Sequence, residues 1–236
     1  MNNYELGEEQ YEKEMYETAY DYFVKAYDEG LFVNDSLNYI GCCQMNLGLL
    51  EEAITTFDKL IEKSPDWERP YFNKGRVLMK QEKFEEALIY FNKAEELNPN
   101  NEDTLFYLGV YYMKVDELEK AKMYYEKSLQ IDDAQAEVHL NLGIVYYRMD
   151  LNEKGIEEFE RALKIDCELV DGYINKSIIE TEMGKYRQAI GTLKNAYLLA
   201  PEDEEILKDI IAIYSKLNDK KRKSYWENKL NALSSE

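Results

Sequence analysis

The residues that could perform catalytic or metal chemistry are few in this 236-residue chain, and their spacings do not suit it. The single histidine, His139, has no second histidine to share a metal. There is no Cys-x-x-Cys pair, phosphate-binding glycine loop or Gly-x-Ser-x-Gly turn. Neighbouring carboxylates such as Glu85-Glu86 are abundant, but exposure on a helix explains them without an acid–base role. The sequence therefore predicts no enzymatic activity, no cofactor and no metal, and a packing role for His139.

The three cysteines, Cys42, Cys43 and Cys167, do not indicate a disulfide framework. Their number is odd, and the adjacent Cys42 and Cys43 have poor geometry for pairing with each other. Free thiols are typical of a reducing compartment, so we expect a cytoplasmic protein. A reactive thiol at Cys42 is one interpretation, and a small packing residue is the simpler one.

The elements that position these residues follow from a repeat. A small residue returns every 34 positions, and this slot holds Gly7, Gly41, Gly75, Gly109, Gly143, Ser177 and, less typically, Ile211. An interval that regular indicates an array of stacked units rather than one closed core. Each period contains two apolar stripes at helical spacing, separated by a short polar break such as that at 80–83. Each period is therefore predicted to be a helical hairpin.

The third period shows the pattern most clearly. Its first stripe consists of Tyr71, Gly75 and Leu78, and its second consists of Ala87, Phe91 and Ala94. Within each stripe the spacings of three or four residues place the side chains on one helical face. Pro65, Pro99 and Pro201 follow the second stripes of their periods, where proline stops a helix.

This pattern resembles the tetratricopeptide repeat family, whose units carry Leu-Gly, then Tyr, then Ala-x3-Phe, with Pro at the turn. The resemblance covers nearly the whole chain. It implies an all-α fold, an α-solenoid of tandem helix-turn-helix hairpins forming a right-handed superhelix. The expected units are 1–33, 34–67, 68–101, 102–135, 136–169 and 170–203, followed by a degenerate seventh unit with capping helices at 204–236. Because no linker interrupts the phase, we expect one elongated domain.

The formal net charge of −19 at pH 7 disfavours nucleic acid and anionic lipid as partners. The N-terminus has neither the basic region nor the apolar region of a signal peptide, and no apolar run is long enough to span a membrane. We therefore expect a protein or peptide partner, no nucleic acid and no membrane.

In tetratricopeptide arrays the side of each first helix opposite the packed stripe lines a concave groove that receives peptides. The same register here predicts partner-binding residues in the third to sixth units: Arg69, Phe72, Asn73, Arg76, Met79, Lys80, Phe106, Tyr107, Lys114, Asn141, Ile144, Tyr147, Arg148 and Asn175. In the third to fifth units this surface carries five bases and two acids, Asp103 and Glu137. A positive segment inside a negative molecule favours an acidic ligand, and its aromatic and Met side chains favour apolar contacts.

Two alternatives bear on this surface. The apolar residues at its fifth register position, such as Phe72 and Leu140, could simply pack against the neighbouring helix. The clamp that some family members use for C-terminal carboxylates needs Lys at that position and Asn four residues later, and the third unit has Phe72 and Arg76 instead. We therefore expect an internal acidic and apolar peptide or helix as the ligand.

The C-terminal segment carries a basic run, 220–223, and an apolar stripe of Trp226, Leu230 and Leu233. The stripe is predicted to seal the last hairpin, and its alternative is a dimer seam; the basic run could alternatively be a localisation signal. The predicted function is a non-catalytic protein-interaction module or scaffold, acting as a monomer. The alternative is a structural or self-assembling scaffold that makes its contacts through Trp226 and Leu230.

Polar residues occupy some positions where the family uses apolar ones. These are Gln44 and Glu180 in place of Tyr or Leu, and Lys74 and Lys176 in place of Leu. From these departures we expect looser packing near both ends of the array.

Overall fold

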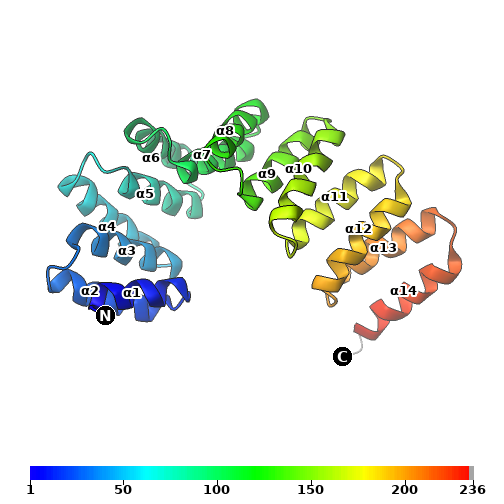
Figure 1. Ribbon diagram of the computed structural model, residues 1–236, viewed down its shortest axis with the longest axis horizontal. Coiled ribbons are helices and arrows are strands. Elements are labelled where there is room, and N and C mark those ends of the chain that lie inside the picture. The colour runs from blue at the N-terminus through cyan, green and yellow to red at the C-terminus, as the bar shows by residue number, and fades with distance from the viewer. Residues whose placement is uncertain (234–236) are drawn as a thin grey trace. The chain divides into compact units, whose positions relative to one another are not determined.

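The computed structural model describes residues 1–233, which form fourteen α-helices and no strand (Figure 1). The helices are α1 (Asn3–Glu12), α2 (Tyr16–Asp28), α3 (Val33–Asn46), α4 (Leu50–Lys63), α5 (Glu68–Lys80), α6 (Phe84–Leu97), α7 (Glu102–Lys114), α8 (Leu118–Ile131), α9 (Ala136–Arg148), α10 (Asn152–Ile165), α11 (Val170–Glu182), α12 (Tyr186–Leu199), α13 (Glu204–Lys216) and α14 (Lys220–Leu233). Each predicted unit contains one pair of them, except that α3 begins at Val33, the last residue of the first predicted unit. The predicted all-α solenoid of hairpins is confirmed, and the last three residues of the expected cap, 234–236, lie outside the described part.

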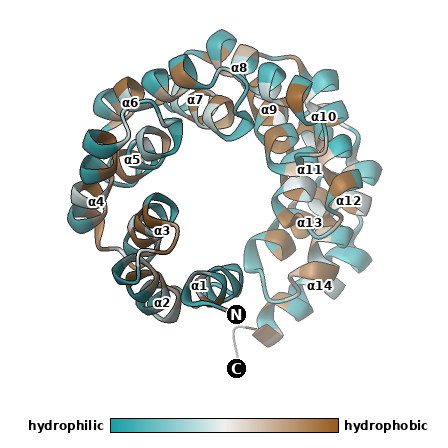
Figure 2. Ribbon diagram, turned by 60° about the vertical axis from the view of Figure 1, so that its left-hand side comes forward, coloured by the Kyte–Doolittle hydropathy of each residue, from teal (hydrophilic) through white to brown (hydrophobic). Residues whose placement is uncertain are grey.

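The chain divides into two compact units, the first ending at Tyr111 and the second beginning at Tyr112, within α7. In the first unit each helix from α1 to α6 packs on the next, and in the second the same holds from α8 to α14. Figure 2 shows that α3 and α5 line the inner side of the first unit, with α4 and α6 outside them. In the second unit α9, α11 and α13 lie inside α10, α12 and α14 (Figure 2). We call the surface of the odd-numbered helices in each unit its A-helix face.

The recurring glycines bring the two helices of a hairpin together. Each of four glycines in a first helix lies against the ring of a phenylalanine sixteen residues later: Gly7 and Phe23, Gly41 and Phe57, Gly75 and Phe91, and Gly143 and Phe159. A Cβ atom on any of these glycines would stand 2.6 or 2.7 Å from the ring. The glycines therefore recur every 34 residues because the two helices of each hairpin approach closely at this point, where a larger residue would obstruct them.

The turn inside every hairpin has the same geometry. Its central residue adopts a left-handed conformation, with φ between 55° and 79°, at Glu14, Gly48, Glu82, Asp116, Asp150, Gly184 and Asn218. The next amide donates to the carbonyl five residues earlier; Lys83 N–H, for example, donates to Leu78 O at 2.9 Å. This Schellman-type closure satisfies carbonyls at the end of the first helix and reverses the chain.

The polar departures from the repeat have internal partners. The Thr56 hydroxyl donates to Gln44 Oε1 at 2.7 Å, and the Thr192 hydroxyl donates to Glu180 Oε2 at 2.7 Å. Each pair therefore replaces an apolar contact by a buried hydrogen bond.

The two lysines are paired in a corresponding way. Lys74 forms an ion pair with Asp58, and Lys176 forms one with Glu160, each on the preceding hairpin. All four polar residues, at which we expected looser packing, therefore have a polar or charged partner nearby.

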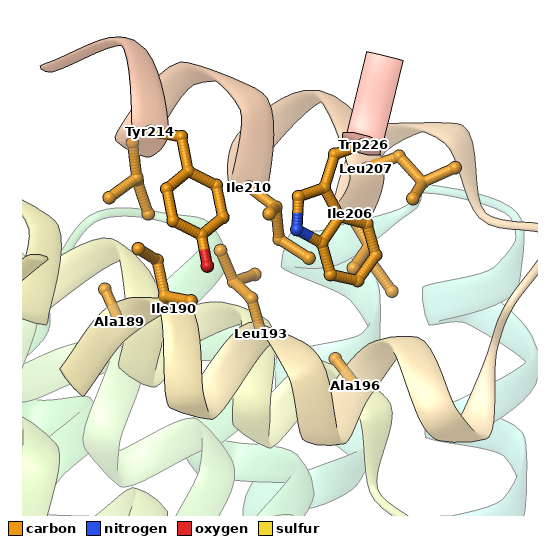
Figure 3. Packing of buried hydrophobic residues seen from close by; sticks show 10 residues of the cluster. Ala189, Ile190, Leu193, Ala196, Ile206, Leu207, Ile210, Tyr214 and Trp226 are labelled. Atoms are coloured by element: carbon orange, nitrogen blue, oxygen red, sulfur yellow. The ribbon is translucent and has the colours of Figure 1, made fainter. Parts of the chain in front are cut away.

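The last hairpin closes on an apolar cluster shared by α12, α13 and α14. Figure 3 shows Trp226 of α14 beside Ile206 and Leu207 of α13. Trp226 is only 7% exposed, and Leu230 and Leu233 are partly buried against the same cluster. The stripe therefore seals the hairpin, as predicted, and Trp226 is not available on the surface for a dimer seam.

Candidate functional site

The A-helix face of the first unit centres on Arg76, a half-buried residue of α5. Its Nε donates to the Tyr107 hydroxyl at 3.2 Å, and its Nη1 lies 3.3 Å from Asn73 Oδ1. The guanidinium also lies over two aromatic rings, 5.5 Å from the centroid of Phe72 and 5.3 Å from that of Tyr107. These contacts hold the planar group in one orientation, which favours cation–π attraction.

The charge of Arg76 is not matched by a direct partner. Within residues 1–233 its guanidinium forms no ion pair with a carboxylate. Burial opposes the charged form, but Tyr107, Cys42 and Tyr11 together outweigh it, so the pKa of Arg76 is raised. Asp103 on the same face is close enough for Arg76 and Arg69 to lower its pKa, although burial and Glu102 raise it overall. The site therefore presents a permanently charged, oriented cation that has hydrogen-bond donors left for a ligand.

The other predicted residues of the first unit divide by exposure. Arg69 and Lys80 are exposed, while Met79, Phe106 and Tyr107 are partly buried. Phe72 and Asn73 are only 8% and 5% exposed. Asn73 Nδ2 donates to Asn38 Oδ1 at 2.9 Å, which links α5 to α3. Asn73 therefore connects two hairpins and orients Arg76, and its amide is already engaged on both sides.

Two tyrosines on the same face lie outside the predicted set. Tyr39 of α3 stacks on Phe23 with 4.5 Å between ring centroids, and Tyr11 of α1 contacts Tyr39 edge-on at 5.2 Å. Burial raises the pKa of Tyr11, while Arg76 lowers it, so the two groups interact electrostatically. Both tyrosines could have been predicted from the sequence. Tyr11 holds the same register position as Tyr147, and Tyr39 holds that of Asn73. Sequence reasoning missed them by concentrating on the later units.

The predicted residues of the second unit are largely engaged within it. Arg148 Nη1 donates to Met113 O at 3.0 Å, and its Nη2 lies 2.6 Å from Asp116 Oδ1. The Tyr147 hydroxyl donates to Glu182 Oε1 at 2.7 Å. The charge of Arg148 is therefore balanced locally, unlike that of Arg76.

The remaining predicted residues there have simpler surroundings. Asn175 Nδ2 donates to Asp171 O at 2.9 Å in its own helix, and Ile144 packs against a core cluster. Asn141 is partly buried, and Lys114 is exposed. The predicted binding roles of all four stay predictions.

The cysteines are free thiols. Cys42 is 6% exposed and packs in an apolar cluster with Phe57 and Val77. Burial raises the pKa of Cys42 to about 11 and that of Cys43 to about 12. Both are therefore thiols at neutral pH, and Cys42 has the packing role that was the simpler interpretation.

His139 is a buried polar link rather than a simple packing residue. Its side chain is 1% exposed; Nδ1 lies 2.7 Å from Glu158 Oε2, and Nε2 lies 3.1 Å from Asp133 O. Burial opposes protonation, but Glu158 and Asp133 outweigh it and raise the pKa of His139. Both ring nitrogens face acceptors, so the doubly protonated ring satisfies both contacts.

Comparisons with known proteins agree with this architecture. A family model described as "Psidin, N-terminal TPR repeats region" matches residues 44–154. No curated protein sequence matches the chain. Within residues 1–233, no helix combines the length and the apolar character needed to cross a bilayer.

Several solved structures superpose on the chain. PilF of Pseudomonas aeruginosa does so with a TM-score of 0.75 at 18% identity, covering 85% of this chain and 91% of PilF. YrrB, described as a TPR protein with an unusual peptide-binding site, gives 0.64 at 18%, covering 76% and 93%. MamA from Desulfovibrio magneticus RS-1 gives 0.65 at 20%, covering 71% and 95%. The chain therefore has the fold of tetratricopeptide repeat proteins, and a TPR family model matches its central part.

Proposed function

We propose that this chain is a non-catalytic protein-interaction module that binds an acidic and apolar segment of a partner on the A-helix face of its first unit. The observation that carries the proposal is the unmatched guanidinium of Arg76, held by Asn73 and Tyr107. Interaction surfaces commonly centre on an oriented arginine among aromatic side chains. YrrB, similar in fold, is described as having a peptide-binding site, which makes peptide binding a reasonable role for this array.

The chemistry around Arg76 specifies the ligand. A planar guanidinium with free N–H groups suits a carboxylate, which can accept two parallel hydrogen bonds. Met79 and Phe106, both partly buried, would contact an apolar residue next to that carboxylate. Because the whole chain carries a net charge of −19, an acidic ligand would be attracted to this place rather than to the average surface.

The other predicted binding residues lie in the second unit, and we propose separately that they contact the partner: Lys114, Asn141, Ile144, Tyr147, Arg148 and Asn175. We propose a weaker role for Arg148 than for Arg76, since Asp116 already balances its charge. We further propose a cytoplasmic monomer, since the free thiols would persist in a reducing compartment.

The proposal can be tested by affinity capture from a lysate of the source organism with three baits: wild type, Arg76→Gln and Lys59→Gln. Lys59 is exposed on α4 outside the A-helix face, so its variant makes the same change in net charge. We expect the Arg76→Gln bait to retain about tenfold less partner than the other two, as for a central interface arginine. Equal retention by all three baits, with unchanged helicity, would remove Arg76 from the site.

A further inference from the structure

A pocket of about 290 Å³ opens on the A-helix face of the second unit, between α11 and α13. Leu193 of α12 contributes to its lining, and Ile178, Ala212 and Ile213 line it from the two flanking helices. Asp209 and Glu182 also line it, from opposite helices. The pocket belongs wholly to the second unit, and none of the residues predicted from sequence lines it.

The repeat register explains why the array is hollow at this place. Leu193 stands where Phe57, Phe91 and Phe159 fill the other hairpins. Ala212 stands where Arg76 and Ile178 stand in earlier units. Two large residues are thus replaced by smaller ones on adjoining helices. The space between the helices is consequently left unfilled.

The charges around the pocket favour a cation. Asp209 forms no ion pair within residues 1–233. Its pKa is raised first by burial and then by Glu205 and Asp203, so its surroundings are short of positive charge. Glu182 is held in place by the Tyr147 hydroxyl. Lys216 also lines the pocket, and its ammonium lies over the Tyr186 ring, 5.7 Å from the centroid.

We propose that this pocket binds a lysine side chain of a protein partner. The aliphatic stem would lie on Leu193, Ala212 and Ile213, and the ammonium would pair with Asp209. A lysine combines the two features that the pocket requires, since its methylenes cover apolar surface while its charged end stays at the rim. The pocket would bind a cation, whereas Arg76 would bind an anion. This proposal therefore does not depend on the binding proposed at Arg76.

The test uses three short acetylated peptides that differ at one central residue: lysine, norleucine and glutamate. Norleucine keeps the aliphatic stem and lacks the ammonium. Binding to the full chain is followed by amide chemical shifts in ¹⁵N-labelled protein. We expect the lysine peptide to bind about threefold more tightly than the norleucine peptide, with shifts at α11 and α13, and the glutamate peptide to bind most weakly.

Three variants separate the two features of the pocket. Asp209→Asn should abolish the preference for lysine over norleucine, and Ala212→Leu should weaken both peptides by filling the cavity. Glu153→Gln, at an exposed acid of α10 outside the pocket, makes the same charge change as Asp209→Asn and should keep the preference. Equal binding of lysine and norleucine to the wild type would overturn the proposal, and so would shifts outside α11 and α13 or no binding at all. Arg76→Gln should leave these affinities unchanged, which keeps the two proposals distinguishable.

Discussion

Gly75 of α5 lies against the ring of Phe91 in α6, so that a Cβ atom on the glycine would stand 2.6 Å from Phe91 Cε1. Phe91 is fully buried and has no space into which to move. The same contact recurs in three other hairpins of the array. Much of the fold depends on this pairing of the smallest residue with a large ring.

Replacing Gly75 with alanine should therefore destabilise the protein by about 1–3 kcal/mol, because the added methyl group overlaps a ring that cannot withdraw. The matched control is Gly191→Ala in α12, where nothing lies within 4 Å of the added Cβ. That control should stabilise the helix by up to about 1 kcal/mol, since alanine has the higher helix propensity. Urea denaturation followed by circular dichroism measures both. A stable Gly75→Ala variant would show that the hairpin tolerates a wider separation.

Glu82 occupies the left-handed position of its turn, with φ of 60°. Glycine adopts that conformation without steric cost, so Glu82→Gly should stabilise the protein by about 0.5–1 kcal/mol. The reverse change is available at Gly48, which has φ of 79° in the equivalent turn. Gly48→Glu should destabilise by a similar amount, and thermal denaturation compares the two. Changes of the same sign would contradict a conformational origin.

His139 should make stability depend on pH. The pKa of its ring is raised in the folded state because Glu158 and Asp133 outweigh burial. The stabilisation from this raised pKa is fully present below the unfolded-state pKa of about 6.5 and is lost as pH rises through the folded-state value. The free energy of unfolding should therefore fall more steeply above about pH 6.5 in the wild type than in His139→Gln. Parallel curves for the two proteins, measured by urea titration across the pH range, would rule out this linkage.

Trp226 should matter for stability and not for association. Truncation to alanine removes a ring from the cluster that closes α12, α13 and α14 and should cost about 3–5 kcal/mol. Tyr225, its neighbour, is 56% exposed, so Tyr225→Ala should change stability by about 0.5 kcal/mol or less. Thermal denaturation with sedimentation analysis separates the roles. A Trp226→Ala variant that keeps its melting temperature but loses association would favour the alternative of a self-assembling scaffold.

The hairpins were predictable because their determinants are local and periodic. The interval from Gly41 to Gly75 and the spacing from Ala87 to Phe91 report helix contacts that each unit makes in the same way. The polar departures were visible but not interpretable, since Lys74 could be understood only once Asp58 was known to lie beside it. A register assigns a residue to a face, and it does not identify the neighbour on the next helix.

The candidate site shows the same limit. The register places Asn73 on the A-helix face, and only the structure shows its amide bonded to Asn38, 35 residues away. The register assigns Arg76 and Arg148 to the same kind of helix face, at different positions of their units, yet the turn residue Asp116 balances only the second. Which cation is left unmatched depends on such contacts between hairpins.

The most direct test of the account is site-specific photocrosslinking from two positions of the first unit. A photoreactive phenylalanine analogue replaces Met79, on the A-helix face beside Arg76, or Ile89, which is 66% exposed on α6. Each variant is irradiated with the partner recovered by affinity capture. Binding at the A-helix face predicts a crosslinked product from position 79 and none from position 89. A crosslinked product from position 89, with none from position 79, would contradict binding at the A-helix face.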